Sequence, residues 1–243
     1  MKLFELVGVK KFADDDLYKV IDSMTHDYKQ VGQGAFGVVL KNTSKPQVIK
    51  FWVTDSSYDD FINYIVAHPN KHLPTLYTKP KQLSSFFKRP KDFPDKVKYV
   101  KMESLQKADG FDARIINDMF KNLLDCHSRS DVTNWIAREL SKPNQHYNEQ
   151  ILERLHEMIA DVPKFCLDMF EMLRKVVHGA STIDIHSDNV MLRSNGEIVI
   201  TDPVFKEGER KDAVELLNAL WRVKTGKEPE SKMVHGKKTG EST

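Results

Sequence analysis

Residues 31–52 combine closely spaced glycines with the apolar pattern of β-strands. The segment reads VGQGAFGVVLKNTSKPQVIKFW, in which Gly32, Gly34 and Gly37 give the spacing G-x-G-x-x-G. In a dinucleotide-binding fold this motif opens a helix, whereas here the chain continues Val-Val-Leu, turns through residues 42–46 and enters a second β-branched and aromatic run. The sequence therefore predicts a glycine-rich β-hairpin. Its backbone N–H groups can approach phosphate oxygens closely, because glycine has no Cβ.

Lys50 lies in the second strand of this predicted hairpin. Strand side chains alternate between two faces, so Val48, Lys50 and Trp52 share one face. We therefore expect Lys50 to project beside the glycines and to meet a phosphate. The alternative is an edge-strand lysine that opposes aggregation, and the neighbouring glycines favour the phosphate-binding interpretation.

A second hairpin is predicted in residues 183–203, which read IDIHSDNVMLRSNGEIVITDP. Asn-Gly at residues 195–196, between two apolar runs, is typical of a two-residue type I′ turn. That turn would place Asn189 opposite Asp202, with Cβ atoms about 4.5–5.5 Å apart. An amide oxygen and a carboxylate oxygen at this spacing can share one Mg²⁺ ion. Asp184, five residues before Asn189, favours a metal site over a surface hairpin with solvated polar ends.

These motifs, in this order, resemble those of the protein kinase family. The glycine-rich segment is followed by V-I-K at residues 48–50 and by D-x-x-x-x-N at residues 184–189, and Asp202 stands where the family has D-F-G. The resemblance covers residues 28–205. It implies an α+β, two-lobed protein kinase-like fold with a strand-rich N-lobe and a reduced helical C-lobe.

The resemblance also implies a role for each motif in phosphoryl transfer from ATP. The three glycines would cover the ATP phosphates and Lys50 would pair with the α and β phosphates. Asp184 would orient or deprotonate the acceptor hydroxyl, while Asn189 and Asp202 would hold Mg²⁺. Residues 99–105 resemble the strand that leads into the adenine-binding hinge. The ATP-binding residues implied in this way are Gly32, Gly34, Gly37, Val39, Val48, Lys50, Met102, Glu103 and Leu105.

The chain departs from the family at several motif positions. Thr-Ile at residues 182–183 precedes Asp184, so the arginine of H-R-D is absent, and we expect activity without phosphorylation of an activation loop. His186 replaces a family lysine; it would either donate to the transferring phosphoryl group or fix the loop through hydrogen bonds. Asp59, with Asp60 beside it, stands where the family has the helix glutamate that pairs with the lysine.

The nearer resemblance is to the early serine/threonine protein kinases of podovirus-type bacteriophages. The shared motifs are D-x-H-S-x-N at residues 184–189 and I-T-D-P-V at residues 200–204. This resemblance implies a serine/threonine protein kinase that requires ATP and Mg²⁺, acts on host bacterial proteins and phosphorylates itself. Two alternatives stay open. One is a small-molecule phosphotransferase similar to aminoglycoside and choline kinases, since D-x-H-x-x-N also occurs there; the other is a pseudokinase that acts as a binding module.

The composition excludes several other classes of protein. Lys and Arg number 37 against 35 Asp and Glu, a net charge of +2, so we expect no direct nucleic-acid partner. The basic stretch Lys81–Lys101 is predicted to be a solvated loop. Two cysteines are too few for a disulfide scaffold. We find neither a signal peptide nor a run of 18 apolar residues, so we expect no membrane association and a location in the cytoplasm of a bacterial host.

The apolar pattern divides the chain into three parts. Residues 1–105 form the predicted N-lobe with a capping segment at its start, and residues 106–227 form the predicted C-lobe. Residues 228–243 are rich in Lys, Gly, Ser and Thr and are predicted to be a disordered tail, a candidate for self-phosphorylation. Helices are predicted at residues 14–24, 147–159, 162–177 and 212–223.

Overall fold

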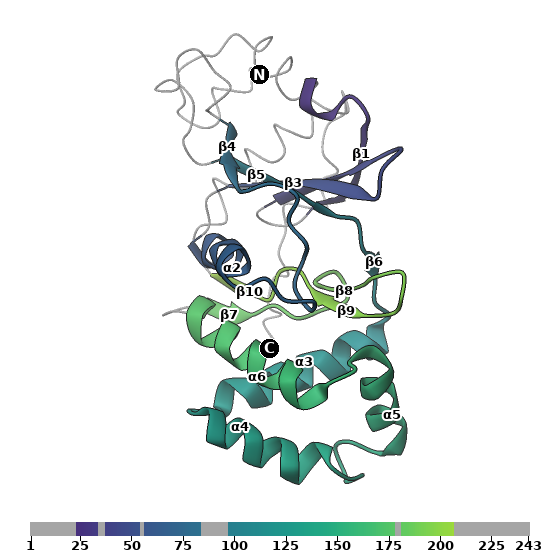
Figure 1. The fold of residues 1–243 in the computed structure, drawn as a ribbon, viewed down its shortest axis with the longest axis vertical. Coiled ribbons are helices and arrows are strands. Elements are labelled where there is room, and N and C mark those ends of the chain that lie inside the picture. The colour runs from purple at the N-terminus through teal and green to yellow at the C-terminus, as the bar shows by residue number, and fades with distance from the viewer. Residues whose placement is uncertain (1–22, 34–36, 54–55, 84–96, 178–180, 207–243) are drawn as a thin grey trace, which may run out of the picture. The chain divides into compact units, whose positions relative to one another are not determined.

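The computed structural model describes residues 23–33, 37–53, 56–83, 97–177 and 181–206 (Figure 1). The chain forms two compact units, which we describe separately. The first holds the described residues up to 53 together with those of 78–102. The second holds residues 56–77 and 103–206. The predicted helices at 14–24 (all but its last two residues) and 212–223, the tail from 228, and Gly34 lie outside the described residues, as does most of Lys81–Lys101.

The first unit is built on a five-stranded sheet whose order is β1-β2-β3-β5-β4. The strands are β1 (Tyr28–Gln33), β2 (Gly37–Asn42), β3 (Gln47–Val53), β4 (Lys81–Gln82) and β5 (Val97–Glu103). β1 pairs antiparallel with β2, and β2 with β3. The pairing of β2 with β3 is the hairpin that the sequence predicts. Ile49 and Phe51 are buried beneath the sheet, and the Phe51 ring lies 5.8 Å from that of Tyr99.

The turn between β2 and β3 is fixed by one asparagine side chain. The Asn42 Oδ1 atom accepts hydrogen bonds from the backbone N–H groups of Ser44 (3.0 Å) and Lys45 (2.9 Å). Such a side-chain turn replaces the ladder hydrogen bonds that end at this point. The predicted turn at residues 42–46 is therefore confirmed.

The second unit contains helices α2 to α6 and two small antiparallel sheets (Figure 1). The sheets have the orders β6-β8-β9 and β10-β7. Its elements are α2 (Ser56–Ala67), β6 (Gln106–Lys107), α3 (Gly110–Asp125), α4 (Arg129–Trp135), a π-helix (Ile136–Leu140), α5 (Glu149–Met158), α6 (Val162–Val176), β7 (Ser181–Ile183), β8 (Val190–Leu192), β9 (Ile198–Ile200) and β10 (Val204–Lys206).

Helix α6 lies at the centre of the second unit, where it packs against α2, α3 and α4. Phe165, Met169 and Met172 are buried in this core, as their helical spacing predicts. The predicted helices at 147–159 and 162–177 are confirmed. Asn148 and Asp161 cap the first turns of α5 and α6, because each side chain accepts a hydrogen bond from the backbone N–H three residues later.

The α+β class is confirmed by this combination of antiparallel sheets and packed helices. The division of the chain differs in one respect from the predicted boundary at residue 105. Helix α2 lies in the second unit, because it packs against α6 and β10. Over the residues described, no helix is both long and apolar enough to cross a membrane.

Candidate active site

The candidate phosphate-binding residues share one face of the first unit's sheet. Gly32 pairs with Val39, and Val39 pairs with Lys50 on β3. Gly37 lies two residues before Val39, and Val48 two before Lys50, so strand alternation places both on the same face. Directly opposed Cβ atoms are about 4.5–5.5 Å apart, so the Lys50 side chain starts beside the glycine-rich segment, as the sequence predicts.

Gly37 has a packing role that the sequence does not reveal. A Cβ atom at this position would lie 2.8 Å from the backbone oxygen of Phe51 and 3.3 Å from Cε of Lys50. At Gly32, by contrast, the nearest atom would be Cβ of Val39, at 3.8 Å. The close approach of β2 to β3 therefore requires glycine at residue 37 and leaves room for a side chain at residue 32.

The type I′ turn predicted for residues 195–196 is wrong. The backbone N–H of Arg193 donates to Glu197 O (2.9 Å), and that of Gly196 donates to Arg193 O (2.9 Å). Within the described chain, Gly196 alone has a positive φ, at 83°, whereas a type I′ turn needs positive φ at Asn195 as well. The loop consequently has three residues, with glycine in the left-handed position.

The longer loop moves the pairing of β8 and β9 by one residue. Met191 pairs with Val199, and the backbone N–H of Thr201 donates to Asn189 O (2.9 Å). Asn189 therefore faces Thr201, and the predicted pairing of Asn189 with Asp202 across the hairpin is also wrong. Asp202 is placed instead by the chain that follows β9 and leads into β10.

Asp184 lies where β7 and β10 end their pairing. The Asp184 backbone N–H donates to Pro203 O (2.9 Å), next to Asp202. The Asn189 amide nitrogen donates to Asp184 O (2.6 Å) and lies 3.3 Å from Asp184 Oδ2. Because these contacts use the amide nitrogen, they do not engage the amide oxygen. This arrangement leaves an oxygen ligand of the kind that Mg²⁺ prefers.

The surroundings of the Asp184 carboxyl shift its pKa. Burial raises the pKa of the Asp184 carboxyl above its usual range; His186 opposes the increase, and the negative charge of Asp202 adds to it. The Asp184 side chain is 40% exposed, so it is accessible from solvent. A carboxylate with a raised pKa is a stronger hydrogen-bond acceptor and a better base.

His186 is bound within the loop itself. Its Nδ1 atom accepts a hydrogen bond from the Asp188 backbone N–H (3.1 Å). Nε2 lies 3.6 Å from Asp184 Oδ1 and 3.1 Å from the Asn189 amide nitrogen. These contacts favour the loop-fixing role among the two that the sequence leaves open. Asp188 in turn forms an ion pair with Lys107 on β6.

The residues expected to contact adenine are positioned by contacts that sequence reasoning missed. Met102 is buried at the end of β5. The next residue, Glu103, uses its carboxylate in a bidentate ion pair with Arg193, at 2.7 and 2.9 Å. Leu105 follows β5 and is half-buried. No local pattern predicts the Arg193 contact, since 90 residues separate the partners.

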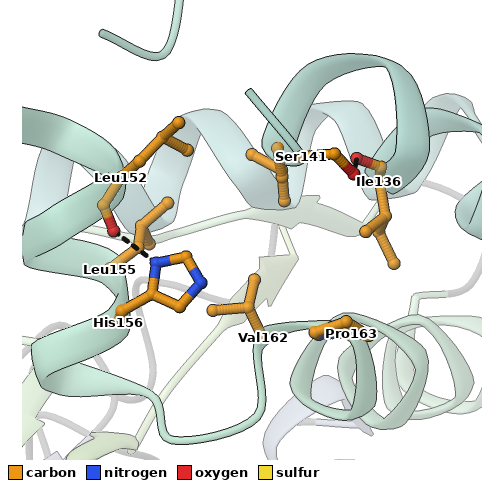
Figure 2. Close-up of a pocket in the computed structure, with 8 residues that line it drawn as sticks. Ile136, Ser141, Leu152, Leu155, His156, Val162 and Pro163 are labelled. Atoms are coloured by element: carbon orange, nitrogen blue, oxygen red, sulfur yellow. Dashed lines mark hydrogen bonds between the residues drawn. The ribbon is translucent and has the colours of Figure 1, made fainter. Parts of the chain in front are cut away.

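A pocket of about 290 Å³ lies apart from these residues, between the π-helix, α5 and the start of α6 (Figure 2). In Figure 2 the His156 ring is tied to the backbone oxygen of Leu152 by a hydrogen bond of 2.6 Å from Nδ1. Besides His156 and Leu152, the residues that line the pocket are Ile136, Leu140, Ser141, Leu155, Val162 and Pro163. None of the predicted site residues lines this pocket, and its lining has no carboxylate or amide side chain, so it lacks the groups needed for phosphoryl transfer.

Comparison with protein-family models matches one segment of the chain. Residues 111–225 match the family model Bacteriophage T7 protein kinase 0.7. The match includes Asp184, Asn189 and Asp202 and excludes the glycine-rich hairpin. The resemblance to phage protein kinases is thus confirmed over this segment, and it supports a kinase-like phosphotransferase.

Three solved structures are similar to the chain at low identity. The crystal structure of spectinomycin phosphotransferase APH(9)-Ia, in complex with ADP and spectinomycin, has 12% identity and a TM-score of 0.34, covering 90% of this chain and 82% of that one. Aminoglycoside phosphotransferase APH(4)-Ia has 11% identity and a TM-score of 0.33, with coverage of 87% and 83%. The streptomycin–ATP–APH(2")-IIa ternary complex has 11% identity and a TM-score of 0.31, with coverage of 82% and 73%. None of the curated proteins matches the chain at a significant level.

Proposed function

We propose that the chain is a serine/threonine protein kinase that uses ATP and Mg²⁺ and acts on host proteins in the bacterial cytoplasm. The observation that carries the proposal is the loop at residues 184–189. There the Asn189 amide nitrogen donates to the Asp184 backbone oxygen at 2.6 Å, and the nearby charge of Asp202 acts on the Asp184 carboxyl. A base at Asp184 and oxygen ligands at Asn189 and Asp202 would meet the needs of phosphoryl transfer within residues 184–202.

Each group in this segment has a separate task. The Asp184 carboxylate accepts the hydroxyl proton of the acceptor, and its partial exposure leaves room for a protein side chain. The Asn189 amide oxygen and the Asp202 carboxylate would hold Mg²⁺, whose chemistry is to neutralise charge on the ATP phosphates. His186 keeps the loop in shape through its hydrogen bond from Asp188.

The first unit carries its own candidate groups for binding phosphates. Lys50 carries a positive charge on the sheet face shared by Gly32 and Gly37. A lysine ammonium there pairs with phosphate oxygens, and the backbone N–H groups of a glycine-rich hairpin add hydrogen bonds. We expect Lys50→Met to lower kcat more than it raises KM for ATP.

The acceptor class is the part of the proposal that most needs a test. The match to a phage protein kinase family favours protein hydroxyl groups. The spacing D-x-H-x-x-N at residues 184–189 also occurs in aminoglycoside and choline kinases, so a small-molecule acceptor is the second candidate. A pseudokinase is the candidate without catalysis.

A labelling experiment separates these three functions. The purified chain is incubated with γ-labelled ATP and Mg²⁺, alone and with bacterial lysate, beside the variants Asp184→Asn and Asp118→Asn. Asp118 is an exposed carboxylate on α3 whose neighbour is Lys121, and it serves as the matched control. We expect label on serine and threonine of lysate proteins for the wild type and Asp118→Asn, and none for Asp184→Asn. Label confined to small molecules would establish the second candidate, and the absence of any transfer would establish the third.

Self-phosphorylation is a separate part of the proposal. The serines and threonines at residues 231–243 lie among lysines, and a phosphate there would add about −1.5 to −2 charges. Mass spectrometry of the wild type and of Asp184→Asn, both expressed in bacteria, tests it. We expect phosphate on the wild type alone; equal modification of both forms would contradict self-phosphorylation.

A further inference from the structure

Arg193 joins three segments of the second unit that are far apart in sequence. It follows β8, and its guanidinium donates to both carboxylate oxygens of Glu103, at 2.9 Å from Nε and 2.7 Å from Nη2. Nη2 also donates to Leu73 O (3.1 Å), and Nη1 donates to Glu197 Oε2 (3.0 Å) and to Lys71 O. One side chain thus holds the end of β5, the segment after α2 and the β8–β9 hairpin.

Glu103 is held on its other side by the segment after α2. Its Oε1 atom accepts a hydrogen bond from the Thr75 backbone N–H (2.8 Å), and its own N–H donates to Thr75 O (3.0 Å). Burial alone would raise the pKa of the Glu103 carboxyl, but the hydrogen bonds from Arg193 and Thr75 lower it below its usual value. The carboxylate therefore stays ionised, and neither it nor the Glu103 N–H is left to contact a ligand.

The segment after α2 is in turn fixed to β9. The Ile200 backbone N–H donates to His72 O (3.0 Å), and His72 Nδ1 donates to Ile198 O (3.0 Å). The contacts form a closed circuit that runs from β9 through residues 71–75 to Glu103 and back through Arg193 to the hairpin. The ion pair is largely shielded from water, with exposed fractions of 18% for Arg193 and 14% for Glu103.

We propose that Arg193 is a positioning residue for the nucleotide base, which it serves by fixing the backbone of residues 103–105 to the β8–β9 hairpin. The inference rests on the proposed function, in which these residues hold adenine and Asn189, at the start of the hairpin, holds Mg²⁺. The carboxylate and N–H of Glu103 are already hydrogen-bonded within the protein. The base is therefore recognised by the remaining backbone groups of residues 103–105. Those groups distinguish a 6-amino purine from a 6-oxo purine only if the backbone is held still.

The test measures the ratio of kcat/KM for ATP to kcat/KM for GTP. Both values scale with the concentration of folded enzyme, so their ratio does not change when a variant is merely less stable. The variants are Arg193→Met, Arg193→Lys, Glu103→Gln and the double variant Arg193→Met/Glu103→Gln. We expect the ratio to fall about tenfold in Arg193→Met and in Glu103→Gln. Arg193→Lys should not restore it, because an ammonium cannot form the bidentate pair.

The chain offers a matched control in a second bidentate pair. On α5 and α3, Arg154 donates to Asp112 at 2.7 and 2.6 Å. Asp112 is buried, with 1% of its side chain exposed. Arg154→Met should lower the thermal midpoint and leave the ATP/GTP ratio at the wild-type value. The double variant Arg193→Met/Glu103→Gln should have an ATP/GTP ratio no lower than that of either single variant, because each single change already removes the same ion pair.

Two results would overturn the inference. One is a wild-type ATP/GTP ratio in folded Arg193→Lys and Glu103→Gln. These two variants keep the volume of the site, so they carry the test if Arg193→Met fails to fold. The other is an equal loss of the ratio in Arg154→Met, which would assign the effect to stability in general. A wild-type chain that neither binds nor uses any nucleotide would refute the proposed function itself, and the inference with it; an active wild type with unaltered variants would refute the inference alone.

Discussion

The two described glycines of the glycine-rich hairpin should respond very differently to alanine. In Gly37→Ala the new Cβ would lie 2.8 Å from the Phe51 backbone oxygen. Ordinary van der Waals contact begins at 3.4 Å, so β2 and β3 must separate locally by about 0.6 Å. In Gly32→Ala the nearest atom lies at 3.8 Å, and no movement is needed.

The expected magnitudes follow from these distances. Forcing an extra carbon into a packed site costs about 1–3 kcal/mol, and replacing glycine by alanine returns about 0.4–1 kcal/mol by restricting the unfolded chain. Gly37→Ala should therefore lower the free energy of unfolding by about 1–2 kcal/mol. For a chain of this size that corresponds to a fall of about 2–8 °C in the thermal midpoint. Gly32→Ala should leave the midpoint unchanged or raise it slightly.

The assay pairs thermal unfolding, followed by circular dichroism, with the steady-state kinetics of phosphoryl transfer. Gly37→Ala should also lower kcat/KM for ATP, because the same Cβ would lie 3.3 Å from Cε of Lys50 and displace that side chain. Equal midpoints for the two variants would refute the packing argument. A loss of stability in Gly32→Ala as large as that in Gly37→Ala would refute it as well.

Three further predictions concern the second unit. Burial lowers the pKa of His72, so the unfolded chain binds its proton more readily than the folded chain does. The free energy of unfolding in urea should therefore be steady above about pH 6.5 and fall as the pH drops below that value. His72→Asn, which keeps a hydrogen-bond donor, should flatten this pH dependence. A pH profile that is the same in the variant and the wild type would contradict the role of His72. Gly196→Ala should cost about 1 kcal/mol because φ is 83°, whereas Asn195→Ala should cost less than about 0.5 kcal/mol; equal losses would favour the type I′ turn after all. Arg154→Met should cost about 3 kcal/mol in thermal or urea unfolding, since it leaves the buried Asp112 carboxylate unpaired, and a loss within about 0.5 kcal/mol would show that the pair contributes little.

The sequence predicts the first hairpin well because its determinants are local. Asn42 lies at the turn and forms the hydrogen bonds that close it, and strand alternation brings Val39 and Lys50 to one face. The grouping of Asp184, His186 and Asn189 was also predictable, since six consecutive residues contain all three. The helices of residues 149–158 and 162–176 follow from apolar spacing together with capping residues.

The register of the second hairpin could not be predicted from local sequence. Asn-Gly suits both a two-residue type I′ turn and a three-residue loop with glycine in the left-handed position. In the folded chain the two ends of the three-residue loop are joined by the ion pair between Arg193 and Glu197. The role of Arg193 was likewise hidden, because its partners outside the hairpin lie 90 to 122 residues away along the chain.

Because α2 packs against α6 and β10, the helix is synthesised before the elements that cover its apolar side chains. The apolar side chains of α2, among them Tyr58, Phe61 and Ile62, are almost fully buried in the folded unit. The residues that begin β10 are made 137 positions after Ala67 ends the helix, which takes about 7–27 s at bacterial rates of translation. β10 is therefore absent throughout that interval, and α6 is absent until its first residue, Val162, is made 95 positions after Ala67. We therefore expect nascent chains stalled before Val204 to be bound by chaperones that recognise exposed apolar segments, and chains released after Lys206 to escape them.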